Sequence, residues 1–253
     1  EMVIRDWSSD VCSSDLLEGK LERISASGRW EMAALTRAES MKPGFFYSWF
    51  KGNHQQWDQD FEREDIFMLG GYLKGPNTLV MPEYRLISGM VYLGPNALPR
   101  QRQGSFSLLR LRLSQGLRLG HWRLDGTCIL QKPTDTVSLR IPEIILKGTI
   151  SVAGYIFQNA LWVEPGITVF WYSSYFGDAY MPSLNAFYLQ SEKAVGNFPV
   201  SDLFLNMKVA RARLFLRYRH FHSSFSGYNY WGAPHYPLQD VGLNFGVIWP
   251  FYD

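Results

Sequence analysis

The chain has 253 residues, of which 46% are hydrophobic and 16% aromatic, and its 25 Lys and Arg nearly balance its 23 Asp and Glu. This composition is too apolar and too weakly charged for a disordered chain. The formal net charge of +2 is too small to indicate a nucleic-acid partner, and none is predicted. Every apolar run is interrupted within a few residues, which excludes transmembrane helices. A mean hydropathy of −0.15 remains compatible with a membrane protein built from alternating strands.

The N-terminal segment differs from the rest of the chain. Residues 5–16 read RDWSSDVCSSDL and match, residue by residue, the translation of a common sequencing-library adapter. We therefore interpret residues 1–16 as an artefactual segment that forms no domain, with a genuine Ser- and Asp-rich terminus as the alternative. Without this segment Cys128 is the only cysteine, so neither an internal disulfide nor a cysteine-based metal site is predicted. On this interpretation the true N-terminus lies upstream, and the sequence carries no information about an export signal.

From Leu17 onward, hydrophobic residues recur with a period of two, which indicates β-strands. In 109–114, three leucines alternate with two arginines and a serine. In 144–156, the apolar residues occupy even positions and oppose Lys147 and its polar neighbours. These runs predict strands with one apolar and one polar side.

Two of the runs change parity part of the way along. In 202–221 the apolar residues shift from odd to even positions near Ala210, which predicts a β-bulge in one long strand. Arg118 and Arg123 also have opposite parity, so a second bulge or a different register is expected there. The last run is regular: the odd positions of 243–251 all carry large apolar side chains.

Short and long connections alternate along the chain. Tight turns are predicted at 74–77, 115–116 and 157–159. Longer connections are predicted near 94–103, 132–142, 176–183 and 223–238. The eleven residues 191–201 are an exception, because a tight turn is expected at that point. This alternation is typical of an up-and-down meander, with about 10 to 12 strands that are long enough for the about 9 to 11 residues of a membrane-spanning strand.

The apolar side of these strands could face either lipid or a second sheet. The opposite side carries Arg, Lys, Thr and Ser, as the lumen of a large barrel does. Aromatic residues gather near strand ends, at 170–180 and 225–236, as they do at membrane interfaces. The chain ends shortly after an aromatic strand, 249–252, as outer-membrane barrels commonly do. These features favour a membrane barrel over a secreted sandwich.

Seven segments of the C-terminal half carry a resemblance through their order and spacing. They are LRIPE at 139–143, YSSYFGDAYMP at 172–182, FYLQ at 187–190, NFPVSDLFLN at 197–206, RYRH at 217–220, PHYP at 234–237 and GVIW at 246–249. Together with fainter matches at 53–57 and 91–92, they resemble the putative porin family of Bacteroidota outer membranes. The resemblance implies a β-barrel in the outer membrane of a Gram-negative bacterium and passive transport of small solutes. Family members are longer, so we interpret the chain as a C-terminal fragment whose barrel would lack closing strands.

The sequence contains no motif that supports catalysis. Neither GxSxG, HExxH, GxGxxG nor a P-loop occurs, and so we predict no enzyme and no cofactor. The acidic residues of 58–65 could bind a hard cation, but a solvated loop fits them better because no glycine turn positions the ligands. His220 and His222 could chelate a metal together with His235, but no further ligand stands at a fixed spacing. We therefore predict no metal site.

We predict that residues 17–253 form the C-terminal portion of an antiparallel, all-β, up-and-down transmembrane barrel that need not be closed. Its predicted partners are the lipid bilayer, small solutes and, through the C-terminal strand, the barrel-assembly machinery. The candidates for the lumen are Arg110, Arg112, Lys147, Arg211, Arg213, Arg217 and Arg219. The candidates for lipid contact are Leu243, Phe245, Val247, Trp249 and Phe251. Rings of arginine favour anions in a pore, but the same residues could instead pair with acids on neighbouring strands.

Two other functions fit the residues. A secreted, all-β carbohydrate-binding module could use the aromatic residues of 223–238 to stack on sugars, and it would bury its apolar side against a second sheet. A structural or secretion-accessory barrel of the envelope would differ from a porin in having an occluded lumen.

Overall fold

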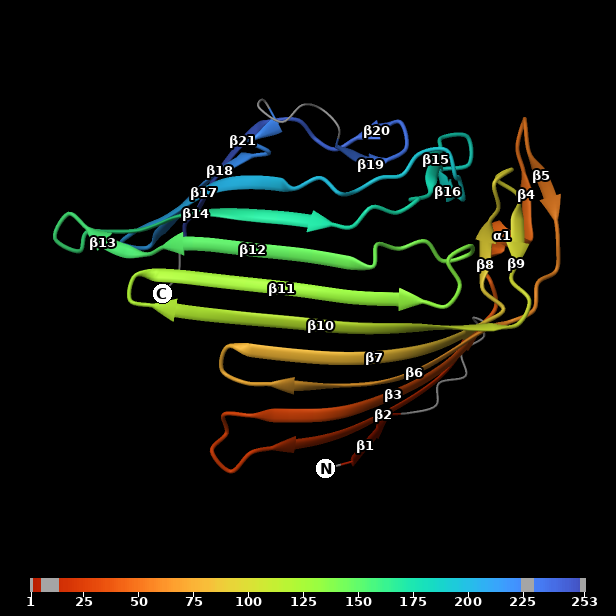
Figure 1. Cartoon of the computed structure of the whole chain (residues 1–253), viewed down its shortest axis with the longest axis horizontal. Helices are drawn as coiled ribbons and strands as arrows, with labels where there is room; N and C mark the ends of the chain where they lie inside the picture. Colours follow the sequence, from red (N-terminus) through yellow and green to blue (C-terminus); the bar gives the residue numbers. More distant parts are fainter. Residues whose placement is uncertain (1, 6–13, 224–229, 251–253) are drawn as a thin grey trace.

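The structure is a computed structural model that describes residues 2–5, 14–223 and 230–250. Most of these residues belong to one long antiparallel sheet, in which each main strand pairs with the main strands that precede and follow it along the chain (Figure 1). Its main strands are β1 (Met2–Arg5), β2 (Ser14–Ile24), β3 (Glu31–Met41), β6 (Glu64–Lys74), β7 (Thr78–Ser88), β10 (Ser105–Leu119), β11 (Trp122–Pro133), β12 (Ile144–Val152), β14 (Leu161–Tyr172), β17 (Val200–Val209), β18 (Ala212–Arg219) and β21 (Gly242–Ile248). The short strand β13 (Gly154–Ile156) also pairs with β14. The predicted antiparallel, up-and-down, all-β fold is confirmed.

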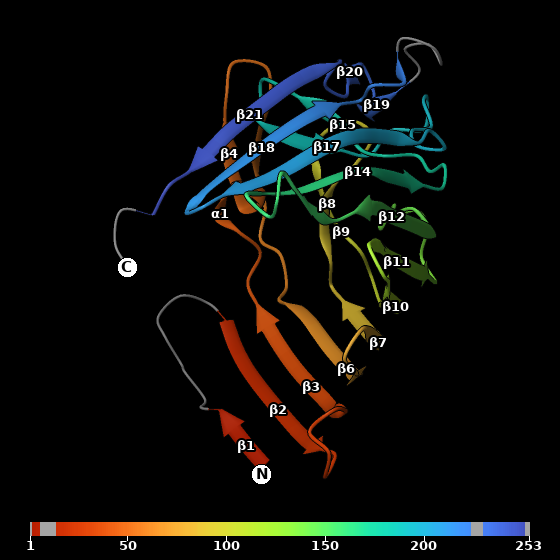
Figure 2. The same cartoon turned by 90° about the vertical axis from the view of Figure 1, so that its left-hand side faces the viewer.

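The sheet is strongly curved but open. Seen along its strands, it follows an arc from β1 at one end to β21 at the other (Figure 2). Within the described residues, β1 pairs only with β2 and β21 only with β18, so the two edges do not meet. No helix among the described residues is long and apolar enough to cross a membrane.

Alternation of side chains sorts the residues of each strand onto two faces. Two residues that are paired directly across neighbouring strands lie on the same face of the sheet. The registers of successive strand pairs therefore show which residues share a face across the whole sheet. In β6, Phe67 and Leu69 are exposed, whereas Ile66 and Met68, which alternate with them, are half-buried. In β7 the half-buried Glu83 lies between more exposed neighbours. On these two strands the apolar face is therefore the more exposed one, the reverse of what a soluble sheet with a core requires.

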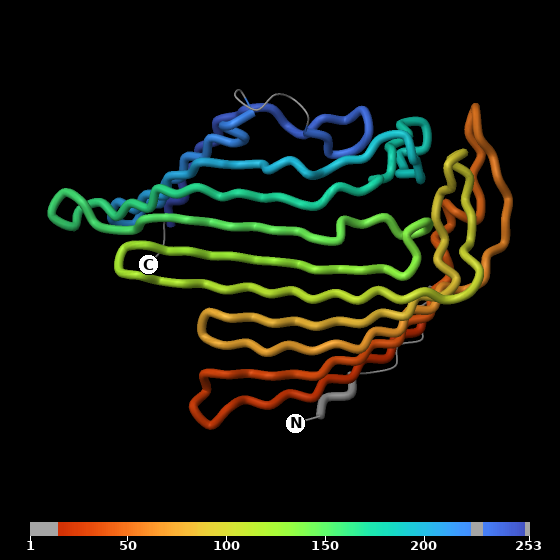
Figure 3. Tube along the Cα trace, viewed as in Figure 1, coloured from red at the N-terminus to blue at the C-terminus, as the bar shows by residue number. Residues whose placement is uncertain are grey.

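Tight turns occur at one end of the sheet, which we call the turn end (Figure 3). The predicted turn at 74–77 is present, with the Gly75 amide 2.8 Å from the carbonyl oxygen of Thr78, and 157–159 also form a turn, with positive φ angles. The turn predicted at 115–116 is wrong, because these residues lie inside β10. The chain reverses instead at 120–121, where Gly120 has a φ of 62°.

The two parity changes mark hairpin turns and not bulges. Ala210, with a φ of 48°, and Arg211 connect β17 to β18, so 202–221 contains two strands. Arg118 and Arg123 lie on either side of the turn at 120–121 and are paired directly. A two-residue turn and an inserted residue both reverse the parity of the apolar positions, which is why the sequence pattern could not separate them.

The longer connections lie at the opposite end, the loop end, and contain short hairpins. These are β4 (Trp49–Lys51) with β5 (Gln56–Asp58), β8 (Val91–Leu93) with β9 (Pro99–Gln101), β15 (Ala179–Met181) with β16 (Ala186–Tyr188), and β19 (Trp231–Ala233) with β20 (Tyr236–Pro237). The one-turn helix α1 (Phe45–Ser48) precedes β4. The segment 191–201 belongs to the long connection from β14 to β17, so the tight turn expected there is wrong.

Three of these connections share a small hydrophobic core. Trp57, Leu93, Ala97 and Leu184 are buried together, and aromatic residues from α1 and β4 pack around them. The hairpins stand at a steep angle to the main strands at the right-hand end of Figure 1. The loop end is thus a packed unit and not a set of independent loops.

The N-terminal strands differ from the predicted boundary at Leu17. β2 begins at Ser14, and Met2–Arg5 pair with it as β1. Part of the segment interpreted as artefactual is therefore placed in the sheet.

Candidate functional site

The polar face of the sheet, which we call the charged face, contains six of the seven lumen candidates. Arg110 is paired with Glu83 on β7 and with Gln131 on β11. Lys147 is paired with Thr127 and Phe170 on the neighbouring strands. The registers extend the same face to β18, whose candidates on it are Arg213, Arg217 and Arg219. Strands far apart in the sequence thus contribute basic side chains to one surface.

Arg211, the seventh candidate, has a different position. It belongs to the two-residue turn between β17 and β18, where no strand alternation fixes the direction of its side chain. Its predicted place on the lumen side depends on 202–221 being one strand, whereas the structure has two.

Acidic residues neutralise part of the charged face near the N-terminal edge. Arg37 on β3 forms ion pairs with Glu18 on β2, at 3.1 Å, and with Glu39 on its own strand, at 2.9 Å. On β2, the Nζ atom of Lys20 lies 2.6 Å from the Oε2 atom of Glu22. These side chains line a groove of about 710 Å³. The sequence analysis missed this cluster, although the alternation of charge in 18–22 could have indicated it.

Glu164 is a second centre that the sequence analysis missed. It accepts hydrogen bonds from Arg123 at 3.0 Å, from Ser151 at 3.1 Å and from Asn206 at 3.2 Å. Its partners come from three strands on both sides of β14, so only the register brings them together. The signal in the sequence was a single carboxylate in the apolar run 161–172.

Several basic residues of the charged face have no acidic partner. Eight ion pairs join described residues, and they involve Arg37, Arg85 and Arg123 on this face. None of them includes the following five candidates: Arg110, Arg112, Lys147, Arg213 and Arg217. Glu83 lies opposite Arg110 in the register, but its ion pair is with Arg85 on its own strand. Arg219 hydrogen-bonds to Gln239.

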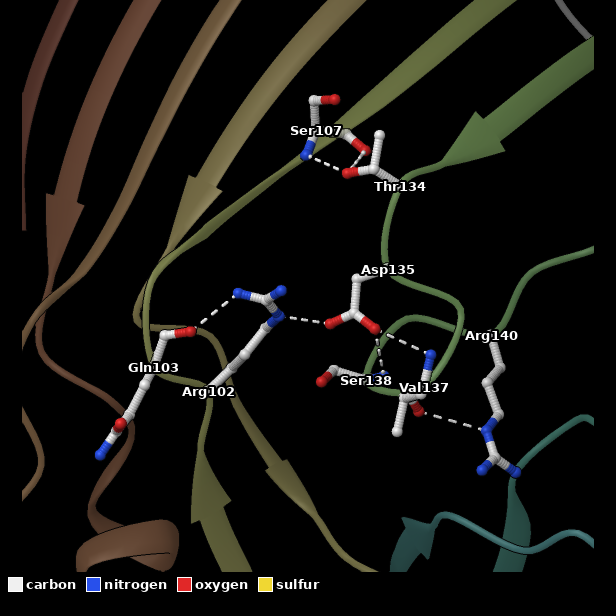
Figure 4. A network of polar contacts seen from close by, with 8 residues as sticks. All are labelled: Arg102, Gln103, Ser107, Thr134, Asp135, Val137, Ser138 and Arg140. Atoms are coloured by element: carbon white, nitrogen blue, oxygen red, sulfur yellow. Dashed lines mark hydrogen bonds and ion pairs between the residues drawn. The ribbon is translucent and has the colours of Figure 1, made fainter.

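A polar network fastens the loop end (Figure 4). Asp135, in the connection from β11 to β12, forms an ion pair with Arg102 and accepts hydrogen bonds from the amides of Val137 and Ser138. Burial alone would raise the pKa of the Asp135 carboxyl, but these hydrogen bonds outweigh it, so the pKa lies below its ordinary value. The network ties two neighbouring connections together.

Arg140 extends this network to a third connection. Its guanidinium donates to the carbonyl oxygen of Val137 at 3.2 Å and also to the carbonyl oxygen of Gln190. The Gln190 side chain in turn donates to the carbonyl oxygens of Gly177 and Lys193. Arg140 and Gln190 belong to the LRIPE and FYLQ segments of the sequence, and these two residues connect the loops.

The residues weighed as metal ligands are arranged differently. In the parts of the chain that the structure describes, no three His, Cys, Asp or Glu side chains are grouped so that they could hold a metal ion. Glu64 of the acidic segment accepts a hydrogen bond from the amide of Val91. His220 is 2% exposed and packs against Tyr230, with ring centroids 4.1 Å apart, whereas His235 is exposed.

The lipid candidates within β21, Leu243, Phe245 and Val247, lie on the apolar face, and Trp249 follows the end of the strand. Their exposed fractions are 63% for Leu243, 79% for Phe245, 58% for Val247 and 62% for Trp249. Phe251 lies outside the described residues. Within the described residues no second sheet packs on this face, because the other sheets are two-stranded hairpins of the connections.

An antiparallel meander with an exposed apolar face and a charged opposite face defines the wall of a β-barrel protein. The chain belongs to the putative porin family, whose model matches residues 13–253. The comparisons found no matching curated protein and no matching solved structure. The predicted family is confirmed.

Proposed function

We propose that this chain forms part of the wall of an outer-membrane channel through which small solutes diffuse passively. The observation that carries the proposal is the exposure of the apolar face, which no second layer covers within the described residues. A large aliphatic or aromatic side chain gains about 1.5 to 3 kcal/mol on leaving water. Lipid would supply this gain along the whole face.

The charged face would line the lumen. An arginine on the lipid side costs about 2 to 4 kcal/mol at the bilayer midplane, so the rows on β10 and β18 require water on their side of the wall. A barrel wall that encloses a water-filled lumen has lipid on its outer face and water on its inner face.

The arginines without acidic partners would give this lumen a preference for anions. Arg110 and Arg112 lie on β10, and Arg213 and Arg217 lie on β18, so their positive charge is spread along two strands. Unpaired arginines in a narrow aqueous passage attract anions and repel cations. Small anionic or neutral solutes are the proposed cargo.

The proposal is tested by the reversal potential of the protein in planar bilayers under a salt gradient. We expect anion preference, reduced by the double change Arg110→Gln and Arg112→Gln because two unpaired charges are removed from the charged face. Arg211→Gln is the matched control for each of the single changes Arg110→Gln and Arg112→Gln, since it likewise removes one charge but from the turn. Cation preference of the unchanged protein, or an equal shift with Arg211→Gln, would refute the arginine mechanism.

The proposed partners follow from the same arrangement. β21 is an edge strand that presents Phe245 and Val247, and it would be the strand that barrel-assembly machinery binds. The alternative of a secreted carbohydrate-binding module requires a second layer over these side chains, and their exposure argues against it.

A further inference from the structure

The apolar face is not smooth. Between β3 and β11 it contains a groove of about 730 Å³, with Ala34, Gly71 and Pro82 among its lining residues. These small side chains lie on adjacent strands, β3, β6 and β7, and follow one another across the sheet. They make a depression because their neighbours on the same face are much larger.

Large side chains form the border of the groove on the side of the loop end. Leu69, Tyr84 and Leu109 lie side by side on β6, β7 and β10, and all three are exposed. Leu111 and Leu130 are in register with Pro82 and line the groove where it continues toward β11. The result is an elongated apolar channel that crosses several strands and is open to the surroundings.

A single basic residue stands at the β11 end of this groove. Lys132 is paired with Leu109, and this register places it on the apolar face. It is exposed and forms none of the ion pairs that join described residues. Glu83 and Arg110 also border the groove, but their parity directs them to the charged face. The exposed Glu143, directly before β12, lines it as well.

In the proposed bilayer, Lys132 would lie toward the headgroups at the loop end. β11 ends at Pro133, so Lys132 lies one residue from the loop end of its strand. A lysine at the bilayer centre is costly, whereas at the interface its cost is small and its ammonium can reach phosphate groups. Leu111 and Leu130 lie two residues, about 7 Å, further from that strand end.

We propose that this groove is a binding site for one anionic phospholipid, with an acyl chain against Ala34, Gly71 and Pro82 and the phosphate on Lys132. The inference rests on the proposed function, because it requires the apolar face to be in a bilayer. A phosphate with an attached chain fits the site through charge at one end and apolar surface along the remainder. A zwitterionic lipid of equal chain length also carries a phosphate, but its choline ammonium offsets the attraction between that phosphate and Lys132.

The test is native mass spectrometry of the protein in detergent, titrated with phosphatidylglycerol or phosphatidylcholine of the same chains. We expect phosphatidylglycerol to be retained about fivefold more than phosphatidylcholine, the size expected for one lysine near a lipid phosphate. Lys132→Gln should abolish this preference, and Ala34→Phe, which fills the groove, should lower the retention of both lipids.

Two control changes accompany these variants. Lys147→Gln removes a lysine from the charged face, and Val169→Phe enlarges the apolar face on β14, away from the groove; neither should alter lipid retention. Equal retention of the two lipids by the unchanged protein, or an equal loss with Lys147→Gln, would overturn the lipid site. Conductance measured on the same protein separates the two proposals: a channel without lipid preference overturns only the site, and lipid preference without conductance overturns only the channel.

Discussion

At the scale of single residues, the loop end depends on one buried acid. The side chain of Asp135 is 9% exposed, and its hydrogen bonds hold the start of the connection from β11 to β12. Its charged form is the one that the fold stabilises, because the folded pKa is depressed. Its contribution to stability is therefore fully present above about pH 4, the ordinary value of an aspartate, and is lost as the pH falls through the depressed pKa.

We predict that Asp135→Asn loosens the loop end and lowers the free energy of unfolding by about 1 to 3 kcal/mol, because Arg102 loses its charged partner. Limited proteolysis of residues 134–143 and urea unfolding in detergent, each at pH 7 and at pH 3, measure the effect. The variant should be less stable than the unchanged protein at pH 7, with a smaller difference at pH 3. Asp60→Asn, in an exposed position of the same end, is the control. A difference between variant and parent that does not depend on pH would contradict the role of the ionised carboxylate.

At the scale of the elements, hairpin turns determine which side chains share a face. The connection at 210–211 is closed by Ala210, whose φ of 48° lies in the left-handed region that favours glycine. This turn gives β17 and β18 a register in which Met207 is opposite Leu214 and Lys208 opposite Arg213. A slip of one residue would exchange the apolar and basic faces of β18.

We predict that Ala210→Gly stabilises the protein by about 0.5 to 1 kcal/mol, because removing the Cβ relieves more strain than the added freedom of the unfolded chain costs. Ala212→Gly, within β18, should have the opposite sign and a similar size. Urea unfolding in detergent micelles compares the two variants. Destabilisation by both changes would show that the turn is not strained.

At the scale of the whole molecule, the large sheet has little interior of its own. The buried hydrophobic cluster lies in the connections, while the main strands leave their apolar side chains exposed on one face. An open sheet of this kind cannot remain monomeric in water, because its apolar side exceeds by far the patches tolerated on soluble proteins.

We predict that the purified chain folds into a β-rich monomer only when detergent or lipid is present and aggregates after its removal. Circular dichroism with size-exclusion chromatography, with and without detergent, measures this. A folded monomer in plain buffer would contradict the assignment of the apolar face to lipid and would favour the soluble alternative.

The sequence by itself determined the strands, their up-and-down order and the family. Alternation along each strand is a local property, and the apolar positions of 109–114, 144–156 and 243–251 therefore predicted the faces of β10, β12 and β21 correctly. The same locality explains the errors at 118–123 and 210–211, because a tight turn and a bulge reverse parity in the same way.

Only the tertiary structure decided which residues meet across strands. The register placed Arg123, Ser151 and Asn206 around Glu164, and it placed Glu83 opposite Arg110. It also placed Lys132 beside an apolar groove whose floor comes from three other strands. Pairing between strands is a long-range property of the folded chain, and the spacing of residues along the sequence does not contain it.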